Sequence, residues 1–202
     1  MTLNYSEEDI NLIQFAKRNK MFFLLTVGVL GVYYSYSTTG NYMLQIIAPI
    51  GGTSEDMGNV FFLAGMVEIP VMIFFETINR RFSCQTLLKV AAVSFVLRIL
   101  AIWLAPSVKL ILAVQILQAL SFALILPTMV EFINQMMDRG EAVKGQALYI
   151  AMTTVASVGA SLLGGMMLDL FGVDIMMAIA AVITVIGAGI ILAVVNRIRK
   201  GV

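Results

Sequence analysis

Three ionisable residues lie deep inside long apolar stretches of the sequence, where a charged side chain is costly. They are Glu68, Arg98 and Glu131. Inside a membrane such side chains usually face the interior of a helix bundle and pair with one another. We therefore expect Glu68 and Arg98 to pair and to bind a solute or a proton. Glu131 lies near the end of its stretch, where a stabilising ion pair or a side chain that reaches the membrane interface is the better interpretation.

A stripe of polar residues follows in the fourth apolar stretch. Gln115, Gln118 and Ser121 succeed one another at three-residue intervals, which places them near one face of a helix. Two interpretations stay open. The amides either hydrogen-bond to neighbouring helices, as glutamine often does in membranes, or they recognise the hydroxyl groups of a solute.

The first apolar stretch is unusually polar in its second half. Thr38, Asn41, Tyr42 and Gln45 recur there at helical spacing, and Gly40 would let the helix bend. This face either lines a watery cavity or belongs to the belt of tyrosines and hydroxyl groups found at membrane interfaces. Under the first interpretation Thr38 and Asn41 join the candidate binding residues.

A charged group stands at the end of the second apolar stretch, where Glu76 precedes Arg80 and Arg81. Retention of basic residues on the cytoplasmic side explains the arginines by themselves. The acidic residue beside them suggests a salt-bridge cluster that locks one conformation. Together with Glu131, these residues form a candidate cytoplasmic gate.

These residues must be positioned by membrane-spanning helices. Of the 202 residues, 60% are hydrophobic and only 12% are charged, against roughly 25% charged in a soluble domain. Six apolar stretches are long enough to cross a bilayer, and backbone groups in lipid must be paired within each helix. They cover residues 21–47, 57–75, 86–105, 110–132, 146–168 and 175–195. The expected fold is an all-α membrane protein with a cytoplasmic segment or linker at 1–20, a bundle at 21–196 and a tail at 197–202.

The distribution of basic residues predicts the orientation of this multi-pass protein in the cell membrane. Lysine and arginine near the ends of spans are retained in the cytoplasm. On one side of the membrane lie ten of them, Lys17, Arg18, Lys20, Arg80, Arg81, Arg139, Lys144, Arg197, Arg199 and Lys200, and on the other side only Lys109. Both termini are therefore expected in the cytoplasm.

Composition excludes several functions. The net charge of +1 argues against a nucleic-acid partner, which needs clustered lysine and arginine. Histidine is absent and Cys84 is the one cysteine, so we expect no metal site and no cofactor. The sequence also lacks a nucleophile elbow or phosphate-binding loop, so we do not expect an enzyme. Because histidine is absent, any proton transfer must use carboxylates.

Small residues predict where helices pack closely. In the fifth stretch, two stripes run at four-residue spacing. They are Ala156, Ala160 and Gly164, and Ser157, Ser161 and Gly165. Ala180, Thr184 and Ala188 repeat the pattern in the sixth stretch.

Several motifs occur in an order that resembles a known family. They are Asn79-Arg80-Arg81, Ser94-Phe95-Val96-Leu97-Arg98, Lys144-Gly145-Gln146-Ala147, Gly164-Gly165 and Asp169-Leu170-Phe171-Gly172. The chain resembles the C-terminal six-helix half of the major facilitator superfamily, in its sugar and nucleoside proton symporter branch, which is lactose permease-like. The resemblance implies half of a twelve-helix fold, built from two inverted three-helix repeats.

The resemblance also implies roles for particular residues. Arg98 matches a buried arginine that takes part in substrate binding and proton coupling in that branch. Glu68 lies about a turn from the position of an acidic substrate-binding residue. Gln118 and Ser121 depart from the branch, which carries a histidine and a glutamate there. A different carboxylate, such as Glu68, would then carry the proton.

Two functions are consistent with these observations. The first is secondary active transport, in which this half contributes to proton-coupled uptake of a small polar solute such as a sugar or nucleoside. Its partners would be the lipid bilayer, the solute, protons, and an N-terminal six-helix half or a second copy of the chain. The alternative is a non-transporting membrane interaction protein that assembles through its small-residue helix faces. That alternative predicts no cavity between Glu68, Arg98 and the face of Gln118.

Overall fold

The structure is a computed structural model that describes residue 15 and residues 18–200, apart from the side chains of residues 139, 199 and 200. Most of the predicted segment 1–20 and the last two residues of the predicted tail lie outside the described residues. The helices are α2 (Lys20–Asn41), α3 (Met43–Ile47), the 3-10 helix η1 (Ala48–Ile50), α4 (Ser54–Arg81), α5 (Cys84–Trp103), α6 (Val108–Val114), α7 (Ile116–Leu120), α8 (Phe122–Met136) and α9 (Arg139–Lys200).

Five continuous helical runs in the described part of the chain are long and apolar enough to cross a membrane. The last of them, in α9, makes two crossings. Helix α9 has 62 residues, and a crossing needs only about 20. It turns at Gly172, which has φ 82° and ψ 178°, a conformation that glycine adopts without steric cost. The described residues thus form an all-α membrane protein with six crossings, as predicted, and are consistent with half of a major facilitator fold.

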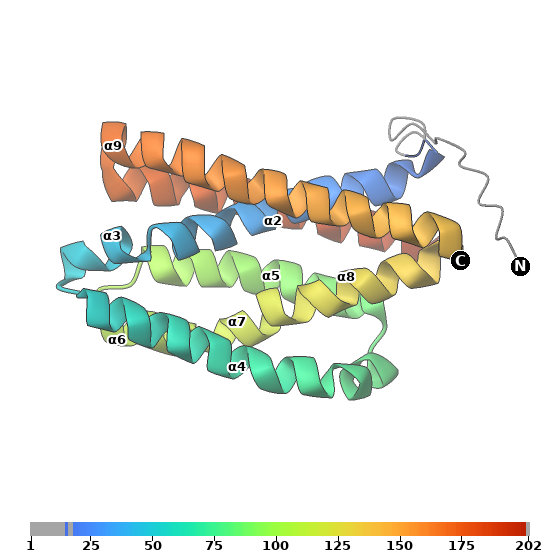
Figure 1. Ribbon diagram of the computed structural model, residues 1–202, viewed down its shortest axis with the longest axis horizontal. Coiled ribbons are helices and arrows are strands. Elements are labelled where there is room, and N and C mark those ends of the chain that lie inside the picture. The colour runs from blue at the N-terminus through green and yellow to red at the C-terminus, as the bar shows by residue number, and fades with distance from the viewer. Residues whose placement is uncertain (1–14, 16–17, 201–202) are drawn as a thin grey trace, which may run out of the picture.

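The helices lie side by side in a bundle (Figure 1). Both arms of α9 run with α2 along one side of the bundle, α4 and α6 lie on the opposite side, and α5 lies between them. The start of α2 and the end of α9 lie at the same end of the bundle. This arrangement follows from an even number of crossings. Which end faces the cytoplasm stays a prediction.

A close helix contact in the core joins α2 to the second arm of α9 through glycines. A β-carbon added at Gly187 would lie 2.6 Å from the backbone oxygen of Gly28 and 2.9 Å from Cα of Gly31. Real β-carbons do not approach other atoms so closely. These positions therefore require glycine, whose lack of a side chain lets the two helix backbones meet. The predicted sixth-span stripe of Ala180, Thr184 and Ala188 is buried beside this contact on α9.

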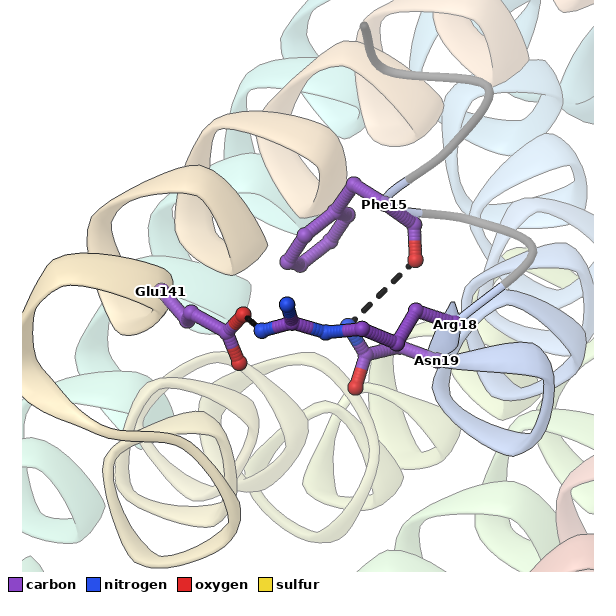
Figure 2. A network of polar contacts seen from close by, with 4 residues as sticks. All are labelled: Phe15, Arg18, Asn19 and Glu141. Atoms are coloured by element: carbon purple, nitrogen blue, oxygen red, sulfur yellow. Dashed lines mark hydrogen bonds and ion pairs between the residues drawn. The ribbon is translucent and has the colours of Figure 1, made fainter. Parts of the chain in front are cut away.

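Polar contacts fix the residues just before α2 to the beginning of α9 (Figure 2). Arg18 forms an ion pair with Glu141, and the side-chain amide of Asn19 donates to the backbone oxygen of Phe15 at 3.3 Å. The ring of Phe15 is 2% exposed and packs edge-on against Phe22, with ring centroids 6.4 Å apart. The chain therefore enters its first crossing anchored to the connection between the fourth and fifth.

The orientation can be tested with cysteines at the two ends of the bundle. Ala48 and Asp138 are exposed on connections at opposite ends. If the basic residues mark the cytoplasmic side, an impermeant maleimide added to intact cells will label Ala48→Cys, and it will label Asp138→Cys only after permeabilisation. The native Cys84 gives little background, because it is buried and its Sγ donates to Asn79 Oδ1 at 3.3 Å. The reverse labelling pattern would show that the orientation is inverted.

Candidate functional site: a polar cavity in the bundle

A cavity of about 330 Å³ opens among the first four crossings and the first arm of α9. This volume is within the range of small-molecule pockets, about 300–1,000 Å³. Its polar lining residues are Tyr36, Ser37, Asn41, Glu68, Arg98, Gln115, Gln118 and Ser157. The cavity brings together five of the six residues that the sequence nominated for solute and proton binding.

Glu68 is the carboxylate on this lining. It lies in the middle of α4, and Gln118 Nε2 donates to its Oε1 at 2.6 Å. Gln118 is buried, and its own Oε1 has no partner among the described residues. Glu68 is only partly buried, and a carboxylate that loses part of its water needs hydrogen-bond donors in its place, so the amide of Gln118 helps to hold Glu68 at the cavity wall.

Arg98 is the cation of the cavity, and its side chain is 5% exposed. Nη2 donates to Gln115 Oε1 at 3.2 Å, and Nη1 donates to Thr39 Oγ1 at 3.4 Å. The guanidinium carbon lies 5.9 Å from the centroid of the Tyr36 ring, within the range of cation–π attraction. Tyr36 in turn stacks on Phe122 with centroids 4.1 Å apart. Arg98 is therefore held from three directions.

The expected direct pair of Glu68 and Arg98 is not formed. Among the described residues, no carboxylate oxygen lies within 4.0 Å of an Arg98 nitrogen. The reason is that two glutamines satisfy the charges separately: Gln118 binds Glu68, and Gln115 binds Arg98. Glu68 and Arg98 thus line the same cavity without forming an ion pair. The cavity therefore offers a solute both a negative and a positive group.

The fourth crossing is interrupted where it carries these glutamines. Gln115 separates α6 from α7, and Ser121, with φ −100° and ψ −90°, separates α7 from α8. The five-residue α7 therefore carries Gln118 on a short helical segment that ends at the non-helical Ser121. Ser121 donates to the backbone oxygen of Leu117 at 2.7 Å, so the third member of the predicted stripe stays inside its own helix.

On α2, the cavity face differs by a small rotation from the predicted one. Asn41 lines the cavity, and its Nδ2 donates to Ser161 Oγ at 2.8 Å. Thr38 is fully buried and donates to the backbone oxygen of Tyr34 at 2.8 Å, so the structure does not bring it into the cavity. Tyr36 and Ser37 occupy the wall in its place.

The four residues of the candidate gate are not brought together. Arg80 pairs with Glu76 at 2.6 Å within α4, and both side chains are exposed. Glu131 accepts from Gln135 Nε2 at 2.9 Å on α8. Within the part of the chain that the structure describes, no ion pair joins Arg81 or Glu131 to the other two. The exposed pair on α4 is worth little by itself, about 0.3–0.5 kcal/mol.

Comparison with known protein families identifies the family of this chain. The family model described as "MFS_1 like family" matches residues 3–178, which is most of the chain. The chain belongs to this major facilitator family. The relationship favours a transport function over an enzymatic one.

Two known proteins are similar to this chain at low sequence identity. A protein of Deinococcus radiodurans named as a sugar efflux transporter is 26% identical over 156 residues, which is 77% of this chain and 40% of that protein. A protein of Geobacillus stearothermophilus named maltose permease is 24% identical over 184 residues, which is 90% of this chain and 46% of that protein. The chain therefore spans less than half the length of either relative.

In this major facilitator chain, sequence reasoning missed several residues of the cavity. Phe61 and Gly65 line it from α4, and their spacing to Glu68, four and then three residues, is the spacing of one helix face. Tyr36 lies in the polar second half of the first apolar stretch and was not among the candidate residues, although it carries the contact to Arg98. The helical spacing around Glu68 was therefore a usable signal, whereas the contact of Tyr36 depends on how the helices pack.

Proposed function

We propose that this chain is one six-helix half of a secondary active transporter and that its cavity binds a sugar or a similar small polar solute during proton-coupled uptake. The observation that carries the proposal is that Glu68 and Arg98, from two different crossings, line one cavity and are each held by a glutamine. Charged residues inside a membrane usually mark a solute or ion pathway.

The chemistry of the lining supports a polyhydroxylated solute. Carboxylate, guanidinium and amide groups are planar, and each offers two hydrogen-bonding atoms that match neighbouring hydroxyl groups. Asn41, Glu68, Arg98, Gln115 and Gln118 provide such groups around the cavity. The names of the two relatives, one a sugar efflux transporter and the other a maltose permease, support the same class of solute.

Glu68 is the proposed proton carrier. The sequence contains no histidine, and Glu68 is the carboxylate that lines the cavity among the described residues. Uptake is the direction that we propose from the resemblance to proton symporters. A second six-helix unit, either an N-terminal half or a second copy, would complete the solute pathway, because carriers of this superfamily bind solute between two such halves.

The test is transport by reconstituted protein. We expect liposomes that contain the chain together with an N-terminal half to accumulate radiolabelled maltose or glucose when an inward proton gradient is imposed. Glu68→Gln should abolish this accumulation because its side chain carries no ionisable proton, yet it should retain exchange of solute across the membrane. Accumulation that does not need the gradient would exclude proton coupling, and the absence of transport and binding for every sugar would exclude the solute class.

The alternative function, a membrane interaction protein that does not transport, predicts no cavity beside Glu68, Arg98 and Gln118. The three residues line one cavity, which favours the carrier. Part of the small-residue surface on which the alternative relied faces that cavity, since Ser157 belongs to the lining and Ser161 accepts from Asn41.

A further inference from the structure

Two glycines in the cavity wall have no packing reason to be glycine. Gly40 in α2 and Gly65 in α4 both line the cavity. A β-carbon added to either would have no heavy atom within 4 Å. Both glycines are exposed, and the space beside each is not filled by another part of the described chain.

Glycine at a helical position without a packing role destabilises the helix. It costs about 0.5–1 kcal/mol relative to alanine. Gly28, Gly31 and Gly187 compensate for this cost, because their missing side chains let two helix backbones touch. For Gly40 and Gly65, no helix contact within the described chain offsets the cost in helix stability. What these two glycines do provide is open space at the cavity lining.

The position of Gly65 is well suited to accommodate a solute ring. It lies on the cavity face of α4 between the aromatic ring of Phe61 and the carboxylate of Glu68. These two residues are seven positions apart, which is about 10 Å along a helix at 1.5 Å per residue. Ala64, the other lining residue between them, is also small. Between the apolar ring and the carboxylate, the lining residues of α4 are thus the small Ala64 and Gly65.

We infer that Gly65, together with Gly40 of α2 in the lining of the same cavity, is a specificity-determining residue that sets the size of the solute. The hydrogen atom of Gly65 leaves room for a sugar ring between Phe61 and Glu68, and any side chain there reduces that room. This inference rests on the proposed function, because it concerns the solute of the same cavity. It predicts that larger residues at position 65 shift selectivity from larger sugars to smaller ones.

The experiment compares two sugars of different size on matched variants. Equilibrium binding of radiolabelled glucose and of radiolabelled maltose is measured on the purified chain assembled with its second half. The variants are Gly65→Ala, Gly65→Val and Gly40→Ala. The control is Gly58→Ala, which lies on the same helix, also has open space at its β-carbon and is not part of the cavity lining.

We expect Gly65→Ala to weaken maltose binding about 10-fold more than glucose binding, since a single methyl group in a pocket discriminates by roughly 10–200-fold. Gly65→Val should increase the difference, Gly40→Ala should act in the same direction, and Gly58→Ala should change neither affinity. Thermal unfolding of the same samples should show that the alanine variants are at least as stable as the native chain, because alanine favours the helix.

The outcomes separate this inference from the function on which it rests. If the native protein binds a sugar and the ratio of the two affinities is unchanged in the Gly65 variants, the inference is wrong and the proposed function stands. Equal weakening of both sugars would also overturn it, because it would assign Gly65 to the contact with the second half. If the native assembly binds neither sugar, both the proposed function and the inference fail.

Discussion

Replacing Arg98 by glutamine is expected to weaken solute binding by about 10- to 100-fold, because a hydrogen bond to a charged group contributes about 1.5–3 kcal/mol. Arg98 is almost completely buried and donates to Gln115 and Thr39. Its charge is the positive one in the cavity lining. Without the guanidinium, the buried Oε1 of Gln115 loses its donor and the solute loses the cation of the cavity lining.

The matched variant is Arg98→Lys. Lysine keeps the positive charge but lacks the planar fork of donors, so it cannot donate to Gln115 and Thr39 in the same way as arginine. We expect binding between that of the native protein and that of Arg98→Gln. Binding is measured with the radiolabelled sugars, and thermal unfolding on the same samples separates loss of the site from loss of the fold. Native affinity in Arg98→Gln would show that Arg98 is not part of the solute site.

The membrane crossings were predictable because lipid imposes a simple rule on sequence. Every crossing must be a helix of about 20 apolar residues, so hydropathy alone locates it. The turn between the last two crossings lies between the predicted stretches 146–168 and 175–195, at Gly172, which adopts a positive φ. Neither result depends on knowing which side chains touch.

The members of the candidate site were partly predictable, but their partners were not. The cost of a buried charge indicated Glu68 and Arg98, and both line the cavity. Whether they pair depends on the rotation of α4 and α5 and on the interruptions at Gln115 and Ser121, which place two amides next to the charges. Helical spacing cannot specify a rotation so finely, and for the same reason Thr38 was assigned to the cavity although it is buried against its own helix.

The packing of α2 against α9 was missed because its signal is spread over two distant helices. Small residues at four-residue spacing within one stretch predict close packing for the fifth and sixth stretches. Gly28 and Gly31 are three residues apart, and their counterpart on α9 is the single Gly187. Three glycines from two crossings make one contact, and a search along one helix does not detect it.

This contact leads to the second large effect that we expect, which is on folding. Gly187→Val should prevent the bundle from forming, and Gly187→Ala should lower the free energy of unfolding by about 1–3 kcal/mol or more, the usual cost of overpacking. The first added carbon would lie 2.6 Å from the oxygen of Gly28 and 2.9 Å from Cα of Gly31. Both are backbone atoms, so no change of side-chain rotamer can relieve the clash, and the helices must separate.

The measurement is the yield of monodisperse protein in detergent and its thermal unfolding, with Gly189→Ala as the control. Gly189 is two residues away on the same helix and has open space at its β-carbon, so alanine there should be neutral or slightly stabilising. Separation of α2 from α9 should also change the shape of the cavity, because α2 carries Tyr36, whose ring contacts Arg98 in the cavity lining. Gly187→Ala should therefore bind sugar more weakly even where it remains folded. Equal stability of Gly187→Ala and Gly189→Ala would show that the two helices do not depend on this contact.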